Sequence, residues 1–190
     1  GADVDVVSSA LGKDSRIGAK YIKGALGYGG PCFPRDNRAF ATLAKRVGAA
    51  AHIAEATDAI NSRQIARVAD LVTGAARPGA KVAVLGMSYK PNTPVVEQSQ
   101  GVMIARTLAE RGFKVVAYDP VALSNAMAEL QGFALRAASA EAAVAEADVV
   151  VVTTPSAEYR DIPAERFARD GERRLVIDCW RLLDAERLRP

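Results

Sequence analysis

The sequence is poor in the residues that build metal centres and disulfide frameworks. Among its 190 residues are two cysteines, Cys32 and Cys179, and one histidine. One histidine and two separated cysteines cannot complete a four-ligand zinc site, so we expect no metal. Two cysteines also make no disulfide framework. We therefore expect free thiols and a cytoplasmic location, where thiols stay reduced.

Long apolar runs and strongly charged tracts are also missing. The longest apolar stretch, near 149–154, is far shorter than the roughly 20 residues that cross a bilayer, and we expect no secretory segment. The formal net charge is +3, with the positive excess inside residues 1–78. Such an excess suits an anionic small molecule but is too small and scattered for a nucleic-acid surface. We therefore expect no membrane partner and no nucleic-acid partner.

Strand and helix patterns alternate through residues 79–190. Short apolar strands are predicted at 81–86, 113–120, 133–136, 147–155 and 173–180. Helical patterns lie between them, at 99–112, 121–131, 139–146 and 163–168. The all-apolar segment at 147–155 is typical of a strand that is covered on both faces. We therefore predict an α/β fold with a doubly wound, parallel, Rossmann-like sheet.

Residues 1–78 are predicted to form a helical central segment. Helices are expected at 3–11, 34–48 and 51–74, with a glycine-rich loop at 12–32. The third helix carries one apolar stripe that we expect to pack in the core: Ile53, Ala56, Ile60, Val68 and Leu71. Pro78 and Gly79 mark the predicted boundary between this segment and an α/β domain at 79–190.

The loops at one edge of the predicted sheet are the candidate ligand site. In doubly wound sheets ligands sit beyond the carboxyl ends of the strands. Here those ends carry residues 86–93, 119–120, 153–155 and 178–181. The first strand is followed by GMSYKPNT and not by G-x-G-x-x-G, so the dinucleotide fingerprint is absent. An NAD-binding Rossmann domain built on this sheet is therefore disfavoured.

The stretch GYGGPCFPRD, at residues 27–36, surrounds Cys32 with glycine and proline. A thiol is a nucleophile only as the thiolate. Cys32 stands just before a predicted helix, whose unpaired N–H groups and dipole favour an anion, and Arg35 adds positive charge. Asp36 could orient a water or accept a proton. The alternative is a buried cysteine in a tight turn, and the flanking residues favour the nucleophile.

Two blocks of the sequence resemble the UDP-glucose dehydrogenase family, part of the UDP-glucose/GDP-mannose dehydrogenases. The family's central part is matched by GADVDVVSSALGKDSRIGAKYIKGALGYGGPCFPRDNRAF. Its UDP-binding domain is matched by KVAVLGMSYKPNTPVVEQS and VVAYDP. The resemblance implies NAD-dependent oxidation of UDP-glucose to UDP-glucuronate, a step of polysaccharide biosynthesis.

The same resemblance implies roles for the residues around the thiol. Cys32 matches the nucleophile that traps an aldehyde as a thiohemiacetal, which a second hydride transfer converts to a thioester. Asp36 matches the aspartate associated with the water that hydrolyses the thioester. The nicotinamide end of NAD is implied to meet Cys32, Phe33, Pro34 and Arg35.

Contacts to the UDP-sugar substrate are implied for a second set of residues: Arg16, Tyr21, Lys23, Gly24, Ala25, Leu26, Gly27, Tyr28, Gly29, Tyr89, Lys90 and Arg181. Arg16 matches an arginine that reaches the sugar site of the partner subunit. The resemblance therefore implies a homodimer, to which the helix at 51–74 contributes.

The sequence departs from the family in three ways. Glu97 stands where an arginine usually meets NAD, and a carboxylate beside a pyrophosphate is unfavourable unless it is neutralised. Arg35 replaces a more usual lysine, which keeps the charge and changes the geometry. The family's N-terminal NAD-binding domain, with its glycine fingerprint, is missing. We therefore expect the chain to be a piece of a longer protein that is inactive alone.

Several alternatives stay open at this point. The sugar nucleotide could be GDP-mannose or a UDP-N-acetylhexosamine. A non-catalytic nucleotide-sugar-binding or dimerisation module would keep the loop at 23–29 and Lys90 but need no reactive thiol. We expect Cys179 to be buried in a strand, Asp119 to cap the following helix, and Asn61 to be a packing group of its helix.

Overall fold

The computed structural model describes residues 1–168 and 174–188. These residues contain a five-stranded, fully parallel sheet with the order β3-β2-β1-β4-β5. Its strands are β1 Lys81–Leu85, β2 Lys114–Tyr118, β3 Ala134–Arg136, β4 Val149–Val152 and β5 Leu175–Asp178. The chain runs outward from β1 in one direction to β3 and in the other direction to β5. The predicted doubly wound α/β fold is confirmed.

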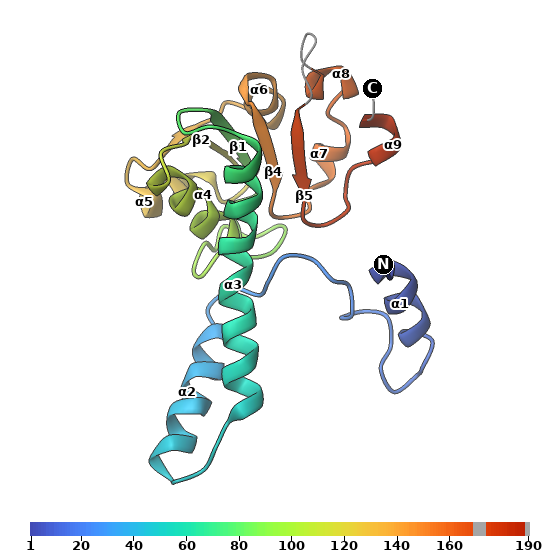
Figure 1. Ribbon diagram of the computed structural model, residues 1–190, viewed down its shortest axis with the longest axis vertical. Coiled ribbons are helices and arrows are strands. Elements are labelled where there is room, and N and C mark those ends of the chain that lie inside the picture. Colours follow the sequence, from blue (N-terminus) through green and yellow to red (C-terminus); the bar gives the residue numbers. More distant parts are fainter. Residues whose placement is uncertain (169–173, 189–190) are drawn as a thin grey trace.

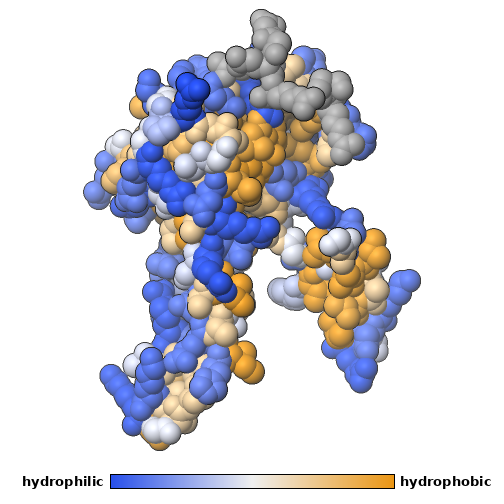
Figure 2. Space-filling model, viewed as in Figure 1, coloured by the Kyte–Doolittle hydropathy of each residue, from blue (hydrophilic) through white to orange (hydrophobic). Residues whose placement is uncertain are grey.

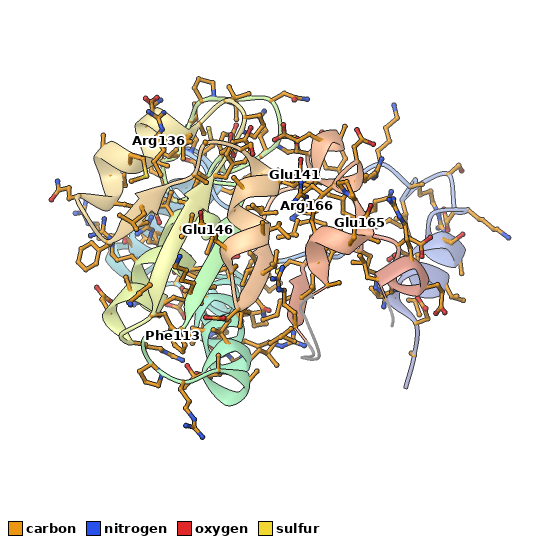
Figure 3. The ribbon with its side chains drawn as sticks, turned by 90° about the horizontal axis from the view of Figure 1, so that it is seen from above. Phe113, Arg136, Glu141, Glu146, Glu165 and Arg166 are labelled. Atoms are coloured by element: carbon orange, nitrogen blue, oxygen red, sulfur yellow. The ribbon has the colours of Figure 1, made fainter. Side chains whose placement is uncertain are left out.

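Helices cover both faces of the sheet (Figure 1). One core lies under α4 (Gln100–Glu110), α5 (Leu123–Leu130) and part of α3 (His52–Ala75). The other lies under α6 (Ala140–Glu146), α7 (Ala157–Arg160) and α8 (Ala164–Phe167), with α9 (Ala185–Leu188) beside it. Figure 3 shows the side chain of Arg166, from α8, pointing toward Glu141 of α6, and its Nε lies 2.5 Å from Oε1 of that carboxylate.

The central strands form where β-branched residues are buried on both faces. All four residues of β4 are valine, and all are buried. β4 ends earlier than predicted because the buried segment continues beyond the ladder into Thr153 and Thr154. The four-residue helices α7 and α9 were not predicted, since one helical turn is too short to show a period.

The helices α2 (Phe33–Arg46) and α3 form a hairpin that projects from the sheet (Figure 1). The predicted core stripe on α3 is wrong for most of its members, since Ile53, Ile60 and Leu71 are 85%, 52% and 51% exposed. The side chains that α3 buries are mostly small: Ala54, Val68, Ala69 and Val72. This happens because α2 and the sheet pack against that side of the helix, which leaves the larger apolar side chains uncovered within the chain.

The first helix, α1 (Val4–Leu11), lies to one side at the end of a long loop (Figure 1). Asp3 caps it, accepting hydrogen bonds from the amides of Asp5 and Val6. None of its residues is buried, and Figure 2 shows apolar side chains gathered on its surface. The loop itself is anchored by Leu26, which packs against the core under α4. No helix among the described residues is long and apolar enough to cross a membrane.

Candidate functional site

Cys32 is the residue immediately before α2, and its thiol is exposed. Its carbonyl accepts the amide of Asp36 at 2.8 Å, which begins the helix. Pro34 lies buried in the first turn, where its fixed φ favours helix initiation. The thiol therefore stands at the positive end of a 14-residue helix, as expected from the sequence.

Charged side chains follow the thiol on the same turn. Arg35 donates from Nε to Oδ1 of Asp36 at 2.7 Å, and both side chains are exposed. The pKa of Arg35 is raised, chiefly by Asp36 and further by the nearby Cys32 and Glu97. Arg35 thus lies in the electrostatic range of Glu97, the carboxylate that departs from the family pattern.

The glycines before Cys32 let the loop approach the segment that follows β1. Gly30 has φ +86°, and its amide donates to the carbonyl of Glu97 at 3.0 Å. A Cβ on Gly29 would overlap the carbonyl oxygen of Gln98, and a Cβ on Gly30 would stand 2.5 Å from the ring of Tyr89. Both positions need glycine because backbone and ring fill the space of a side chain.

Tyr28 is fixed by amide side chains from two helices. Its amide donates to Oδ1 of Asn61 at 2.8 Å, and its carbonyl accepts Nδ2 of Asn61 at 2.9 Å. The same carbonyl accepts Nε2 of Gln100, from α4, at 3.1 Å. The Tyr28 ring meets Phe33 edge to face, with centroids 6.2 Å apart. Asn61 is therefore a packing group as expected, but it fixes the loop and not only its own helix.

Sequence reasoning missed the roles of Gln100 and Gln98 in holding this loop. Gln100 is buried, which is unusual for a glutamine. Its position at the start of a predicted helix was no sign of a contact 72 residues away. Gln98 has φ +50°, and such a conformation in a non-glycine residue cannot be seen in the sequence.

The segment after β1 takes the place of a dinucleotide-binding turn. Thr153 Oγ1 donates to the carbonyls of Leu85 and Gly86, and Thr154 Oγ1 donates to the carbonyl of Ser88 at 2.9 Å. A Cβ on Gly86 would stand 2.6 Å from Thr154. The turn at the switch point between β1 and β4 is thus filled by protein atoms. This close packing leaves no room for a side chain at Gly86, so the position requires glycine.

Asp119 secures the same segment from the end of β2. It is buried, and its Oδ2 accepts the amides of Met87 and Ser88 at 2.7 and 3.0 Å. Its Oδ1 accepts the amides of Val121 and Ala122 at 2.8 and 2.7 Å. Asp119 therefore closes the turn ahead of α5 and does not cap the helix, whose N-cap residue is Ala122 and has no side-chain cap, so the expected capping role is wrong. The carboxylate instead joins the loop after β1 to the end of β2.

Tyr89 and Lys90 lie in this segment, beside the cysteine loop. The ammonium of Lys90 is 5.3 Å from the centroid of the Tyr89 ring, a cation–π distance. Lys90 is exposed, and Tyr89 is half-buried against Gly30. The structure therefore brings together predicted site residues from both parts of the chain.

Arg181 lies beyond the end of β5 and contacts α1. Its Nη1 is 3.0 Å from Oδ1 of Asp3 and 2.5 Å from Oδ2 of Asp5. Asp3 and Asp5 were not predicted as site residues, because acidic residues at a helix start are ordinary. A partner 178 residues away along the chain leaves no local signal.

The remaining predicted site residues are spread along the exposed arm. The hydrogen bonds that Arg16 donates within the described chain all go to Asp14, at 2.6 to 3.0 Å. Tyr21 is 96% exposed. The segment at 23–25 is exposed too, and Gly24 lies beside Val4 of α1. The structure does not bring Arg16 or Tyr21 to Cys32 within one chain.

The second thiol, that of Cys179, is less exposed than the thiol of Cys32. Burial, with the nearby Asp178, raises the pKa of Cys179 to about 12, so this thiol stays protonated at neutral pH. The described part of the chain holds no group of three His, Cys, Asp or Glu side chains that could bind a metal ion.

Comparison with known proteins places this geometry in a family. Residues 83–185 match the UDP-binding domain, and residues 1–63 the central domain, of the UDP-glucose/GDP-mannose dehydrogenase family. The chain belongs to this family. The UDP-glucose 6-dehydrogenase of Rhizobium meliloti is 34% identical over 181 residues, which cover 94% of the chain and 41% of that protein. The chain thus spans about two fifths of the length of this curated relative.

Solved structures of the family show the same fold. A UDP-glucose dehydrogenase from Pyrobaculum islandicum superposes with a TM-score of 0.86 at 30% identity, over 97% of this chain and 43% of that one. A GDP-mannose dehydrogenase from Pseudomonas aeruginosa superposes with a TM-score of 0.75 at 20% identity, over 96% of this chain and 43% of that one. The first likeness confirms the resemblance seen in the sequence, and the second shows the fold alone.

Proposed function

We propose that the chain supplies the nucleophile and the UDP-sugar site of an NAD-dependent UDP-glucose 6-dehydrogenase. The observation that carries the proposal is the exposed thiol of Cys32 at the start of α2, in a loop that packs against the UDP-binding domain. A nucleophile held against a nucleotide-sugar domain suits covalent oxidation of the sugar. An exposed nucleophilic thiol also favours a cytoplasmic location, where it stays reduced.

The chemistry proposed at Cys32 balances over two oxidations. Loss of a hydride from C6 and of a proton from the 6-hydroxyl gives an aldehyde, to which the thiol adds as a thiohemiacetal. Loss of a second hydride and proton gives a thioester. Water then cleaves the carbon–sulfur bond, which releases the uronic acid and restores the thiol. Asp36, one turn along α2, is the residue we assign to orient that water.

Two NAD molecules, bound one after the other, would each accept one of the two hydrides. The residues present fit the nicotinamide end of NAD: Phe33 offers an exposed apolar ring beside Cys32, and Arg35 offers a cation. Pro34 is buried, so its role there is to hold the turn. The turn after β1 lacks the G-x-G-x-x-G fingerprint, so we assign no dinucleotide site to this sheet. We propose that other residues of a longer protein hold the rest of the dinucleotide.

The UDP-sugar is proposed to bind between the arm and the loop after β1. Lys90 is an exposed cation next to the cysteine loop, and Arg181 is a second cation beyond β5. Two cations beyond the carboxyl ends of parallel strands suit a diphosphate. The glycines at 24, 27 and 29 allow the arm to wrap the sugar closely, with Tyr21 and Arg16 at its exposed end.

We also propose a homodimer formed through the uncovered stripe of α3. Ile53, Ile60 and Leu71 are exposed, and their spacing places them within about 20° of one line on a helix. Such a line is expected to be covered by another protein surface. We expect Ile60→Asp to yield a monomer in light scattering, whereas the same change at the exposed Leu135 should not alter the mass. A monomeric wild-type chain would contradict this part.

The direct test is calorimetric titration of the chain with UDP-glucose, with GDP-mannose as control. We expect saturable binding of UDP-glucose alone. Iodoacetamide labelling in the same samples should be slowed at Cys32 by UDP-glucose and not by GDP-mannose. Binding without protection would favour a non-catalytic nucleotide-sugar-binding module. Absence of binding to either nucleotide would contradict a formed UDP-sugar site in this chain.

A further inference from the structure

Arg181 is engaged by two carboxylates of α1. Its Nη1 contacts Asp3 at 3.0 Å and Asp5 at 2.5 Å, and all three side chains are more than half exposed. The pKa of Asp3 is lowered, first by the amide of Asp5 and then by Arg181, and the pKa of Arg181 is raised by Asp5 and Asp3. The three groups together carry one net negative charge.

The backbone that carries Arg181 is fixed independently of these contacts. Asp178 accepts the amide of Trp180 at 3.0 Å with Oδ1 and the amide of Leu183 at 2.7 Å with Oδ2. Arg181 between them has φ +50°, a conformation that a non-glycine residue adopts only where its surroundings enforce it. The side chain can therefore change partners while its base stays at the ligand edge of the sheet.

Helix α1 has little else to hold it against the α/β domain. None of its residues is buried, and in the described chain its ion pairs to that domain both run to Arg181. Exposed ion pairs of this kind are individually weak. A ligand that takes the arginine would therefore release the start of α1 at little cost.

We propose that Arg181 is a shared cation, held by Asp3 and Asp5 in the free protein and transferred to the diphosphate when a nucleotide sugar binds. This inference rests on the proposed function, in which Arg181 faces the UDP-sugar. Asp3 and Asp5 then weaken nucleotide binding, because the diphosphate must displace them from Arg181. They do not touch the substrate; they act through Arg181 and couple the position of α1 to occupancy of the site.

The test compares Kd values for UDP at low ionic strength, measured by calorimetry on the full chain. The variants are Asp3→Asn with Asp5→Asn, Arg181→Gln, and all three changes together. Asparagine preserves the helix cap at position 3. Glu141→Gln is the matched control, since it removes the carboxylate of another exposed arginine pair, with Arg166, and neither residue is assigned to the site. UDP is the probe because it carries the diphosphate without the sugar.

We expect the Asp3/Asp5 double variant to bind UDP about three- to tenfold more tightly, which is the effect of removing two exposed ion pairs. The asparagine changes should have no effect once Arg181 is Gln, and Glu141→Gln should have none. Hydrogen exchange of the α1 amides should rise when UDP is added to the wild type.

Two results would overturn the shared cation while leaving the UDP site in place. One is weaker or unchanged UDP binding by the Asp3/Asp5 double variant. Weaker binding would mean that the carboxylates position Arg181 for the ligand, and unchanged binding would mean that they have no effect on it. The other is equal tightening in Glu141→Gln or on the Arg181→Gln background, which would show that the effect is general electrostatics. If Arg181→Gln binds UDP as tightly as the wild type does, or if the wild type does not bind UDP, the proposed contact between Arg181 and the UDP-sugar is wrong.

Discussion

Gly30 lies flat against the ring of Tyr89, so close that a Cβ on Gly30 would stand 2.5 Å from two ring atoms, Cδ2 and Cε2. This contact joins the loop that carries Cys32 to the segment that carries Lys90. The position of the thiol therefore depends on packing between two parts of the chain that are distant in sequence, and glycine is required where they meet.

Substituting Gly30 by alanine should destabilise the protein by about 3 kcal/mol or more, because a left-handed backbone strain adds to a steric overlap with Tyr89. Chemical denaturation measures the loss. Gly48→Ala is the control: Gly48 has φ +73° with nothing within 4 Å of its Cβ position, so only the strain, about 1 kcal/mol, applies. Equal losses in the two variants would show that the Gly30–Tyr89 contact contributes nothing.

Removing the Asn61 side chain should loosen the cysteine loop. Asn61→Ala leaves the amide of Tyr28 without its partner and costs about 1–3 kcal/mol. Hydrogen exchange at the Tyr28 amide should become faster, and UDP-glucose binding should weaken. Gln64→Ala is the matched control, because Gln64 makes one long hydrogen bond, 3.4 Å, to the carbonyl of Ile60 in its own helix. An unchanged exchange rate at Tyr28 would contradict a supporting role for Asn61.

The two thiols should differ sharply in alkylation. Iodoacetamide at pH 8 should modify the exposed Cys32 and leave Cys179 unmodified, because the pKa of Cys179 is raised to about 12 and the neutral thiol is unreactive. In denaturant both should react. Mass spectrometry of the peptides measures each site. Modification of Cys179 in the folded protein would mean that the turn after β5 opens readily.

Glu158 should make stability fall as pH rises. Its Oε2 lies 3.4 Å from the hydroxyl of Tyr118, and Oε1 has no hydrogen-bond partner among the described residues. Burial, with Asp119 nearby, raises its pKa above the usual 4.5. A carboxyl group whose pKa is higher in the folded than in the unfolded protein stabilises the fold fully below the unfolded pKa, here about 4.5. That stabilisation is lost as the pH rises through the folded pKa. Glu158→Gln should remove that loss.

The unfolding free energy of wild type and Glu158→Gln, measured from pH 4 to 8, tests this point. As the pH increases above about 4.5, the unfolding free energy of Glu158→Gln should rise relative to that of the wild type. Glu165→Gln, on the exposed side of α8, is the control and should track the wild type. A difference that is constant with pH would show that the charge of Glu158 is not what matters.

The local sequence predicted the parts of the site whose causes are local. Cys32, Pro34 and Asp36 lie within one turn, so their place at a helix start follows from short-range chemistry. The alternation of apolar strands with helices was sufficient for the doubly wound sheet, since a strand of four valines can be stable only between two covered faces.

Side-chain burial on α3 could not be predicted in the same way. The apolar stripe through Ile53, Ile60 and Leu71 has a regular period, and a regular period predicts a covered face. It does not show whether this chain provides the cover. In the structure α2 and the sheet lie on the side of Ala54 and Val72, so the stripe is exposed.

The sequence by itself determined the fold class, the thiol at the start of a helix and the absence of a dinucleotide fingerprint, because each depends on residues that are neighbours along the chain. Only the tertiary structure decided that Asn61 holds Tyr28, that Tyr89 requires glycine at position 30, and that Arg181 is held by Asp3 and Asp5. These pairs are 33 to 178 residues apart, and such contacts follow from how the packed elements meet and not from any local preference.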